Sequence, residues 1–294
     1  MLDLLVPTVA QGLLWALLAL GVYVTFRVLD IADLTVEGSF PLGAATAASL
    51  MAAGCGPLTA LLAAFVTGML AGIVTGVLHT KMKIPALLAG ILTMIALYSV
   101  NLRIMGKANL SLLGVDTLFK IAKNALALNT AQTTFIVGLA VVLIVGGFLY
   151  WFFGTQIGAA IRATGFNQQM IRAQGVDTDV TIILGLLLSN GLVAVSGALV
   201  AQSNGFSDVG MGTGTIVIGL ASVIIGEVLF GTRSFKNCLI SVVLGSIVYR
   251  IVIAAVLAMG MPPNDLKLFT SVLVALALSM PLIKNKLGMR KAVR

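Results

Sequence analysis

The stretch GTQIGAAIRATGFNQQMIRAQGVD, from Gly154 to Asp177, is a polar segment that separates two strongly apolar runs, Thr134–Phe153 and Thr181–Ala201. Each run has about 20 residues, the length of helix that crosses a bilayer core about 30 Å thick. A segment rich in Arg, Gln and Asn cannot lie in that core, where its polar groups would find no water. The sequence therefore predicts a loop at the membrane surface between two transmembrane helices.

The composition extends this prediction to the whole chain of 294 residues. Hydrophobic residues make up 59% and charged residues 10%, whereas soluble domains carry about 25% charged residues. The 32 glycines favour closely packed helices. Neither the alternating strands nor the aromatic girdles of a membrane β-barrel are present. We therefore predict an all-α polytopic membrane protein with a single transmembrane domain over residues 1–294.

The apolar runs predict about nine transmembrane or broken helices, given the ~20 residues that one crossing needs. They are Leu5–Phe26, Phe40–Ala53, Leu58–Leu78, Ile84–Met105, Thr134–Phe153, Thr181–Ala201, Thr215–Phe230, Leu239–Leu257 and Leu268–Ile283. The second and seventh runs are short. Short segments interrupted by Gly or Pro are typical of broken helices that line a cavity inside a membrane bundle.

The basic residues predict the orientation of the chain. If the spans alternate, one side of the membrane receives the loops 79–83, 154–179 and 231–237 and the C-terminal tail. Lys and Arg are retained in the cytoplasm, so we expect the N-terminus outside and the C-terminus inside. Retention also explains the net charge of +8 without a nucleic-acid partner. The exterior loop 106–133 is an exception, because it carries three lysines.

Two further patterns are open to two interpretations each. The segment from Asp33, DLTVEGSFPLGAATAASL, resembles FSDVGMGTGTIVIGLASV from Phe206, either as an inverted repeat or by chance. In the exterior loop, helical spacing of apolar residues predicts a short helix that lies on the outer leaflet or receives a soluble partner. Those residues are Leu118, Ile121, Ala122, Ala125 and Leu128.

The chain lacks the motifs of an enzyme. It has no G-x-x-x-x-G-K-[ST], G-x-S-x-G or H-E-x-x-H sequence, and its titratable residues are scattered. We therefore expect no catalytic residue, metal or cofactor in this chain. Ion-coupled transport would need ionisable groups within the spans. Glu227 and Arg250 are the candidates; they could pair with each other or snorkel separately, and we favour a structural role.

The polar loop from Gly154 to Asp177 is expected to contain a short helix at the membrane surface. Thr164 is expected to cap it, Gly175 to end it, and Arg172 near its end suits the helix dipole. Such a helix could dock against a soluble partner, or it could anchor the bundle at the interface. The residues alone leave these alternatives open.

A family resemblance favours docking. The motif small-x-x-[IL]-R-A-T-G-x-N, then A-x-x-x-G-[IV] and G-L-A-x-[VI]-I-x-G, resembles membrane permease subunits of bacterial ABC importers in the branched-chain amino acid/ribose permease group. The matching residues are Ile161–Gly165, Asn167, Arg172, Ala173, Gly175, Val176, Gly219–Ala221, Gly226 and Glu227. The N-terminal ALGVYVTFRVLDIADLTVEGSFPLGA is similar to the branch of tryptophan/tyrosine-type permeases. Phe166 departs from the acidic or polar residue found in many relatives.

The resemblance implies a homodimer in the bacterial cell membrane, driven by a separate ATPase subunit that binds ATP and Mg. It also implies an extracellular or periplasmic solute-binding protein that delivers the solute. In that family this loop contains the coupling helix that contacts the ATPase. The candidate coupling residues are accordingly Thr164, Gly165, Asn167, Gln168, Met170, Ile171, Arg172 and Gly175.

Polar residues near broken or small-residue segments are candidates for the solute pathway, although each could instead form a helix–helix hydrogen bond or a cap. They are Glu37, Ser39, Asn190, Ser196, Gln202 and Asn204. We expect the acidic run of Asp30, Asp33 and Glu37 on the cytoplasmic side, either solvated or facing the ATPase. A self-sufficient secondary transporter is the alternative function, and a membrane scaffold is a third. The solute, an amino acid or a similarly small molecule, is not identified by the sequence.

Overall fold

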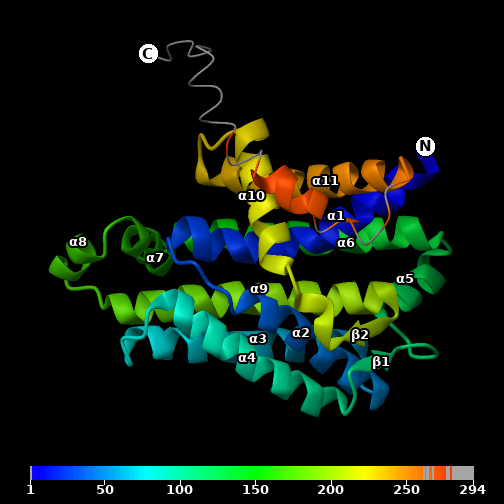
Figure 1. Cartoon of the computed structure of the whole chain (residues 1–294), viewed down its shortest axis with the longest axis horizontal. Helices are drawn as coiled ribbons and strands as arrows, with labels where there is room; N and C mark the ends of the chain where they lie inside the picture. The colour runs from blue at the N-terminus through cyan, green and yellow to red at the C-terminus, as the bar shows by residue number, and fades with distance from the viewer. Residues whose placement is uncertain (1, 261, 263–264, 267, 276–278, 280–294) are drawn as a thin grey trace, which may run out of the picture.

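The computed structural model describes residues 2–260, 262, 265–266, 268–275 and 279 (Figure 1). In chain order the elements are α1 (Leu2–Tyr23), the π-helical turn η1 (Val24–Val28), α2 (Val36–Ala52), α3 (Pro57–Thr80), α4 (Ala86–Met105), β1 (Asn109–Ser111), α5 (Leu118–Leu126), α6 (Thr130–Gly154), α7 (Gln156–Phe166), α8 (Gln168–Ala173), α9 (Thr178–Asn204), β2 (Phe206–Asp208), the 3-10 turn η2 (Val209–Gly212), α10 (Thr215–Phe230) and α11 (Phe235–Ala258).

Within the described part of the chain, seven helical segments are long and apolar enough to cross a membrane. They correspond to seven of the predicted runs, which confirms an all-α polytopic membrane protein. The run predicted at Phe40–Ala53 is α2, a helix of 17 residues that begins earlier, at Val36. The last predicted run, Leu268–Ile283, extends outside the described residues.

The long helices α1, α6 and α9 run side by side along the longest axis of the molecule (Figure 1). Helices α7 and α8 lie at one end, which we call the α7–α8 end. The N-terminus, α5, β1 and β2 lie at the other, which we call the β1–β2 end. There β1 pairs antiparallel with β2, joining Asn109 to Asp208 and Ser111 to Phe206. The two polar loops predicted on opposite sides of the bundle are therefore at opposite ends.

Helix α9 forms the centre of the bundle. In the most apolar 18-residue window of α9, 83% of the residues are buried, whereas the share is 17% in α6, which therefore lies at the periphery of the bundle. Helix α2 crosses α9 at backbone contact. A Cβ at Gly43 would lie 1.9 Å from the Ala194 carbonyl oxygen, and one at Gly197 would lie 1.9 Å from that of Phe40. Only glycine permits this approach, which is the use of small residues expected in membrane bundles.

Two helices begin inside the bundle. Helix α2 follows the irregular segment after η1, and α10 follows η2. Their first turns are adjacent, since the Gly214 amide that precedes α10 donates a hydrogen bond of 3.0 Å to the Glu37 carboxylate in α2. Irregular backbone at this depth is tolerated where protein surrounds it or a cavity adjoins it. The junction of α2, η2 and α10 is therefore the place where an internal site is expected.

Candidate functional site

Helix α7 is fixed to the bundle through its last two turns. Thr155 caps its start by accepting a hydrogen bond from the Gly158 amide. Thr164 is fully buried and its hydroxyl lies 2.8 Å from that of Thr181 in α9. Gly165 lies against the backbone of Val28, at the end of η1. The helix is thus held by both α9 and the end of the α1–η1 segment.

Helix α8 is short and mostly exposed. Asn167 separates it from α7 and caps it, accepting a 3.0 Å hydrogen bond from the Met170 amide. Ile171 is the buried residue of α8 and anchors it, while Met170 is 45% exposed and Phe166, just before the break, is 91% exposed. Gly175 follows with a φ of +85°, the left-handed conformation that ends helices. Together α7 and α8 present an exposed surface with three large apolar side chains, Ile157 near the start of α7 and Phe166 and Met170 on either side of the break.

The predicted capping role of Thr164 is wrong. The segment forms two helices instead of one, Thr164 lies inside the first, and Asn167 caps the second. The predicted end at Gly175 is confirmed. Among the candidate coupling residues, Thr164 and Ile171 are buried and Gly165 packs on Val28. The candidates exposed at the surface are Asn167, Gln168, Met170, Arg172 and Gly175. Phe166, which the sequence marked only as a departure from its relatives, is the most exposed apolar side chain there.

A cluster of charges ties α8 to neighbouring elements. The Asp179 carboxylate at the start of α9 is 3.1 Å from Arg172, 3.5 Å from Lys81 and 3.8 Å from Lys83. Each basic side chain is more than half exposed, and exposed ion pairs of this kind contribute about 0.2–1 kcal/mol each to the free energy of unfolding. The contacts place the α3–α4 loop and the α7–α8 loop at one end of the bundle. Two basic loops predicted to share a side of the membrane therefore lie at the same end of the bundle.

At the same end, Arg27 of η1 forms a bidentate ion pair with Glu227 in the last turn of α10. Its Nε donates to both carboxylate oxygens, at 2.8 and 3.0 Å, and its Nη2 also contacts Glu227. The Glu227 side chain is 11% exposed. Of the two alternatives for Glu227 and Arg250, the mutual pair does not form, because Glu227 pairs with Arg27 and Arg250 lies over the ring of Trp15.

Near the start of α2, buried polar side chains form a network with α9. Asn190 donates a 2.8 Å hydrogen bond to Asp33, and Ser39 donates one of 2.6 Å to Asn190. Asp33 also accepts from the Thr35 amide, at 2.8 Å. Asp33 is 3% exposed and bonded to Asn190, so neither expected environment, solvated or facing the ATPase, holds for it. The network holds the irregular segment before α2 against the middle of α9.

A cavity of about 450 Å³ lies beside this network, between α2, α4 and η2. Glu37 lines it, together with Tyr98, Ser99, Asn101 and Thr213. Its volume is within the range of small-molecule sites, about 300–1,000 Å³. Ser39 and Asn190 bond with each other nearby, so the structure brings three of the candidate pathway residues close to the start of α2.

The other three candidate pathway residues lie elsewhere. Ser196 donates a 2.8 Å hydrogen bond to the Leu14 carbonyl and so joins α9 to α1. Gln202 accepts one of 3.0 Å from the Leu118 amide and holds the start of α5. Asn204 is the last residue of α9. Ser196 and Gln202 therefore have the helix–helix and capping bonds that were the alternative to solute contact.

Comparisons with known proteins agree with this arrangement. Residues 4–279 match the family described as "Branched-chain amino acid transport system / permease component". The chain is 41% identical over 270 residues to the tyrosine transport system permease protein of Clostridioides difficile (strain R20291), covering 92% of this chain and 88% of that protein. It is also 34% identical over 284 residues to an uncharacterized protein of Rickettsia prowazekii (strain Madrid E), covering 95% and 98%.

Among solved structures, an ABC transporter of the metal-chelate type in an inward-facing conformation matches with a TM-score of 0.53 and 14% identity. The match covers 96% of this chain and 85% of that one, and it supports the fold alone. The apolar helices and the relatives indicate a multi-pass protein of the bacterial inner membrane. This chain belongs to the family of permease components of branched-chain amino acid transport systems, and it is an ABC transporter permease.

Proposed function

We propose that the protein is the membrane subunit of an ABC importer that moves an amino acid, with an aromatic one as the first candidate, into the cell. A homodimer of the chain would form the pathway, a solute-binding protein would deliver the solute, and two copies of a separate ATPase would supply the energy from ATP and Mg. The 41% identical relative named as a tyrosine transport permease supports an amino acid as the solute.

The α7–α8 end is proposed to face the cytoplasm. It gathers Arg27, Lys81, Lys83 and Arg172, and the positive-inside rule places such clusters inside the cell. The N-terminus then lies outside, at the β1–β2 end (Figure 1). Lys107, Lys120 and Lys123 remain at the exterior end, and Lys120 is compensated there by an ion pair of 2.7 Å with Asp116.

The surface of α7 and α8 is the proposed ATPase contact. Phe166 and Met170 are exposed apolar side chains on a support fixed by buried Thr164 and Ile171. A displacement of this support would act on the α1–η1 segment through Gly165 and Val28. It would then reach α10 through the pair of Arg27 with Glu227. Because ATP can shift only an equilibrium between states of different affinity, closure of the ATPase must favour one arrangement of these helices.

The pathway is proposed to pass the junction of α2, η2 and α10, where Glu37 lines the cavity of about 450 Å³. Two local features support an inverted repeat around this junction. Asp33 accepts a hydrogen bond from the amide two residues later, and Asp208 does the same with Gly210, at 2.8 and 2.7 Å. Each acid precedes a helix that starts inside the bundle, and inverted repeats of this kind often meet at a transport site.

The exposed apolar pair on α7 and α8 carries the proposal, and a double variant tests it. Phe166→Ser with Met170→Ser should weaken association with the ATPase at least about tenfold, because desolvated apolar anchors dominate interfaces. Leu113→Ser is the matched control, since Leu113 is 88% exposed on the loop after β1 at the other end. Co-purification of both variants with the ATPase at wild-type yield would contradict the proposed contact.

A self-sufficient secondary transporter is the alternative function. The observation in its favour is that α10 and α11 contain the ionisable residues Glu227 and Arg250, and ion-coupled transport needs ionisable groups within the spans. Proteoliposomes separate the two functions. The importer requires ATP, the ATPase and the binding protein for uptake of labelled amino acid. Uptake by this chain alone, driven by an ion gradient, would instead support the secondary transporter.

A further inference from the structure

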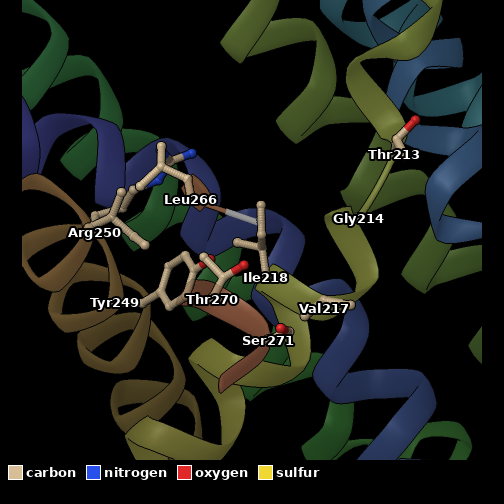
Figure 2. Close-up of a pocket in the computed structure, with 10 residues that line it drawn as sticks. Thr213, Gly214, Val217, Ile218, Tyr249, Arg250, Leu266, Thr270 and Ser271 are labelled. Carbon is tan, nitrogen blue, oxygen red and sulfur yellow. The ribbon is translucent and has the colours of Figure 1, made fainter. Parts of the chain in front are cut away.

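A second cavity, of about 310 Å³, lies where α10 begins, beside α11 and Leu266, Thr270 and Ser271 (Figure 2). Its polar lining comes from Thr213, Gly214, Tyr249, Arg250, Thr270 and Ser271. Figure 2 shows Tyr249 and Arg250 extending from α11, and Val217 and Ile218 on α10. Thr213 also lines the cavity that contains Glu37, so the two cavities adjoin the same η2–α10 junction.

Arg250 has no acidic partner among the described residues. Its guanidinium carbon lies 4.2 Å from the centre of the Trp15 ring, which is a cation–π contact. Its Nε is buried and has no hydrogen-bond partner in the described part of the chain, and the same holds for Nε1 of Trp15. Both atoms can only donate hydrogen bonds. Two unpaired donors on side chains in contact require acceptor atoms that the described residues do not provide.

The depth of Arg250 makes this arrangement unusual. At 1.5 Å per residue, it lies about 22 Å along α11 from Phe235 and about 12 Å from Ala258. Ser246, one turn earlier, bonds to the Gly12 carbonyl in α1, so this part of α11 packs inside the bundle. An ionisable side chain at such depth is costly and typically marks a functional site with a specific partner.

We propose that Arg250 binds the carboxylate of the solute, in a subsite formed by the cavity at the start of α10. A carboxylate offers two acceptor oxygens that match the donors of a guanidinium in bidentate geometry. Gly214 and Val217 at the start of α10, a helix of 16 residues, line the same cavity, and a helix N-terminus favours negative charge. The Gly214 amide already donates to the Glu37 carboxylate, so Arg250 is the group proposed to hold the solute carboxylate. The ring of Tyr249 and the apolar side chains of Val217 and Ile218, which line the cavity, would accommodate the rest of an amino acid.

The subsite rests on the proposed function, because it names the group of the amino acid that the pathway recognises. A phospholipid headgroup is a second source of oxyanion chemistry. Arg250 lies about 12 Å from the nearer end of α11, which favours the solute, since headgroups lie at the membrane surfaces.

The fluorescence emission of Trp15 can report directly whether the site is occupied. The chain contains two tryptophans, so Trp151→Phe leaves Trp15 as the sole reporter next to Arg250. In nanodiscs of phosphatidylcholine, L-tyrosine and L-leucine should each be titrated against their decarboxylated amines, tyramine and isoamylamine. We expect a saturable change in Trp15 emission with at least one amino acid and none with its amine. A response to both members of each pair, or to no probe, would overturn the proposal.

Three variants separate recognition from packing. Arg250→Gln should weaken the apparent affinity at least about tenfold, the loss expected for a hydrogen bond to a charged group. Arg250→Lys should retain part of the affinity and the preference for the carboxylate. Arg103→Gln is the matched control, because Arg103 is an exposed arginine in the last turn of α4, and it should bind as the parent does. Equal affinity of Arg250→Gln and Arg103→Gln would contradict the subsite.

Two further measurements complete the test. If Trp15 emission changes when phosphatidylglycerol replaces phosphatidylcholine without amino acid, and the amino acids then have no effect, the occupant is a lipid and the proposal is wrong.

In the assembled transporter, ATP-dependent uptake by the wild type tests the proposed function, and a fall of about tenfold or more in Arg250→Gln tests the subsite. Uptake equal in both would overturn the subsite alone. A Trp15 response without ATP-dependent uptake would contradict the importer function and still support the carboxylate site.

Discussion

Gly165 in α7 lies so close to Val28 at the end of η1 that a Cβ at position 165 would come within 1.9 Å of the Val28 carbonyl oxygen. The neighbouring Thr164 bonds to Thr181 of α9. The exposed α7–α8 surface therefore has rigid backbone and buried side-chain contacts with two long helices. A force applied there would reach the bundle without an intervening flexible segment.

Replacing Gly165 with Ala tests this contact. The added methyl group meets backbone atoms that cannot rotate away, so we expect a destabilisation of about 1–3 kcal/mol, typical of overpacking. Thermal unfolding in detergent or nanodiscs measures it. Gly147→Ala is the matched control, because a Cβ at that helical glycine would have nothing within 4 Å. Equal unfolding temperatures for the two variants would show that α7 does not depend on this contact.

The pair of Arg27 with Glu227 connects η1 to α10. Arg27→Gln leaves the Glu227 carboxylate, 11% exposed, without its charged partner, and we expect a loss of about 1–3 kcal/mol. Arg27→Gln with Glu227→Gln should cost less than the sum of the single variants, because neither charge is then left alone. A double-mutant cycle on unfolding gives the coupling energy. Strict additivity would mean that the pair contributes nothing.

The buried network at the start of α2 should be more sensitive than the other polar contacts of α9. Asn190→Ala removes the side-chain donor to Asp33 Oδ2 and the acceptor of Ser39, while Asp33 keeps its bond from the Thr35 amide. We expect a cost of about 2–4 kcal/mol from the two atoms that lose their partner. Ser196→Ala removes one neutral hydrogen bond to Leu14 and should cost about 1 kcal/mol. Chemical or thermal unfolding of the two variants provides the comparison, and a larger loss in Ser196→Ala would contradict this ranking.

The sequence predicted the helices well because length and hydropathy determine which segments can cross a membrane. It also located the polar loop and the helix end at Gly175, which depend on local backbone preferences. The break at Asn167 was missed, because Thr and Asn are both good caps and Thr164 precedes Asn167 by only three residues. The exposure of Phe166 was indicated in the sequence, because many relatives have an acidic or polar residue at this position.

Side-chain partners were harder to predict, since they depend on which helix faces are adjacent. Asp33 looked like part of a solvated acidic run, yet Asn190 in the middle of α9 buries it. Glu227 and Arg250 lie on neighbouring helices, but Glu227 pairs with Arg27 and Arg250 contacts Trp15. Periodicity identifies a buried face without identifying the element packed against it.

The proposed mechanism requires that the α7–α8 surface faces the cytoplasm, where an ATPase can reach it. Labelling with a membrane-impermeant maleimide tests this orientation most directly, using Gln168→Cys in a Cys55→Ser, Cys238→Ser background. The parent chain is the control, because Cys55 is exposed in the turn between α2 and α3, at the end proposed to be exterior. We predict that Cys55 is labelled in intact cells and that the cysteine at position 168 is labelled only in inside-out vesicles. Labelling at position 168 in intact cells would contradict the proposed orientation and the ATPase contact with it.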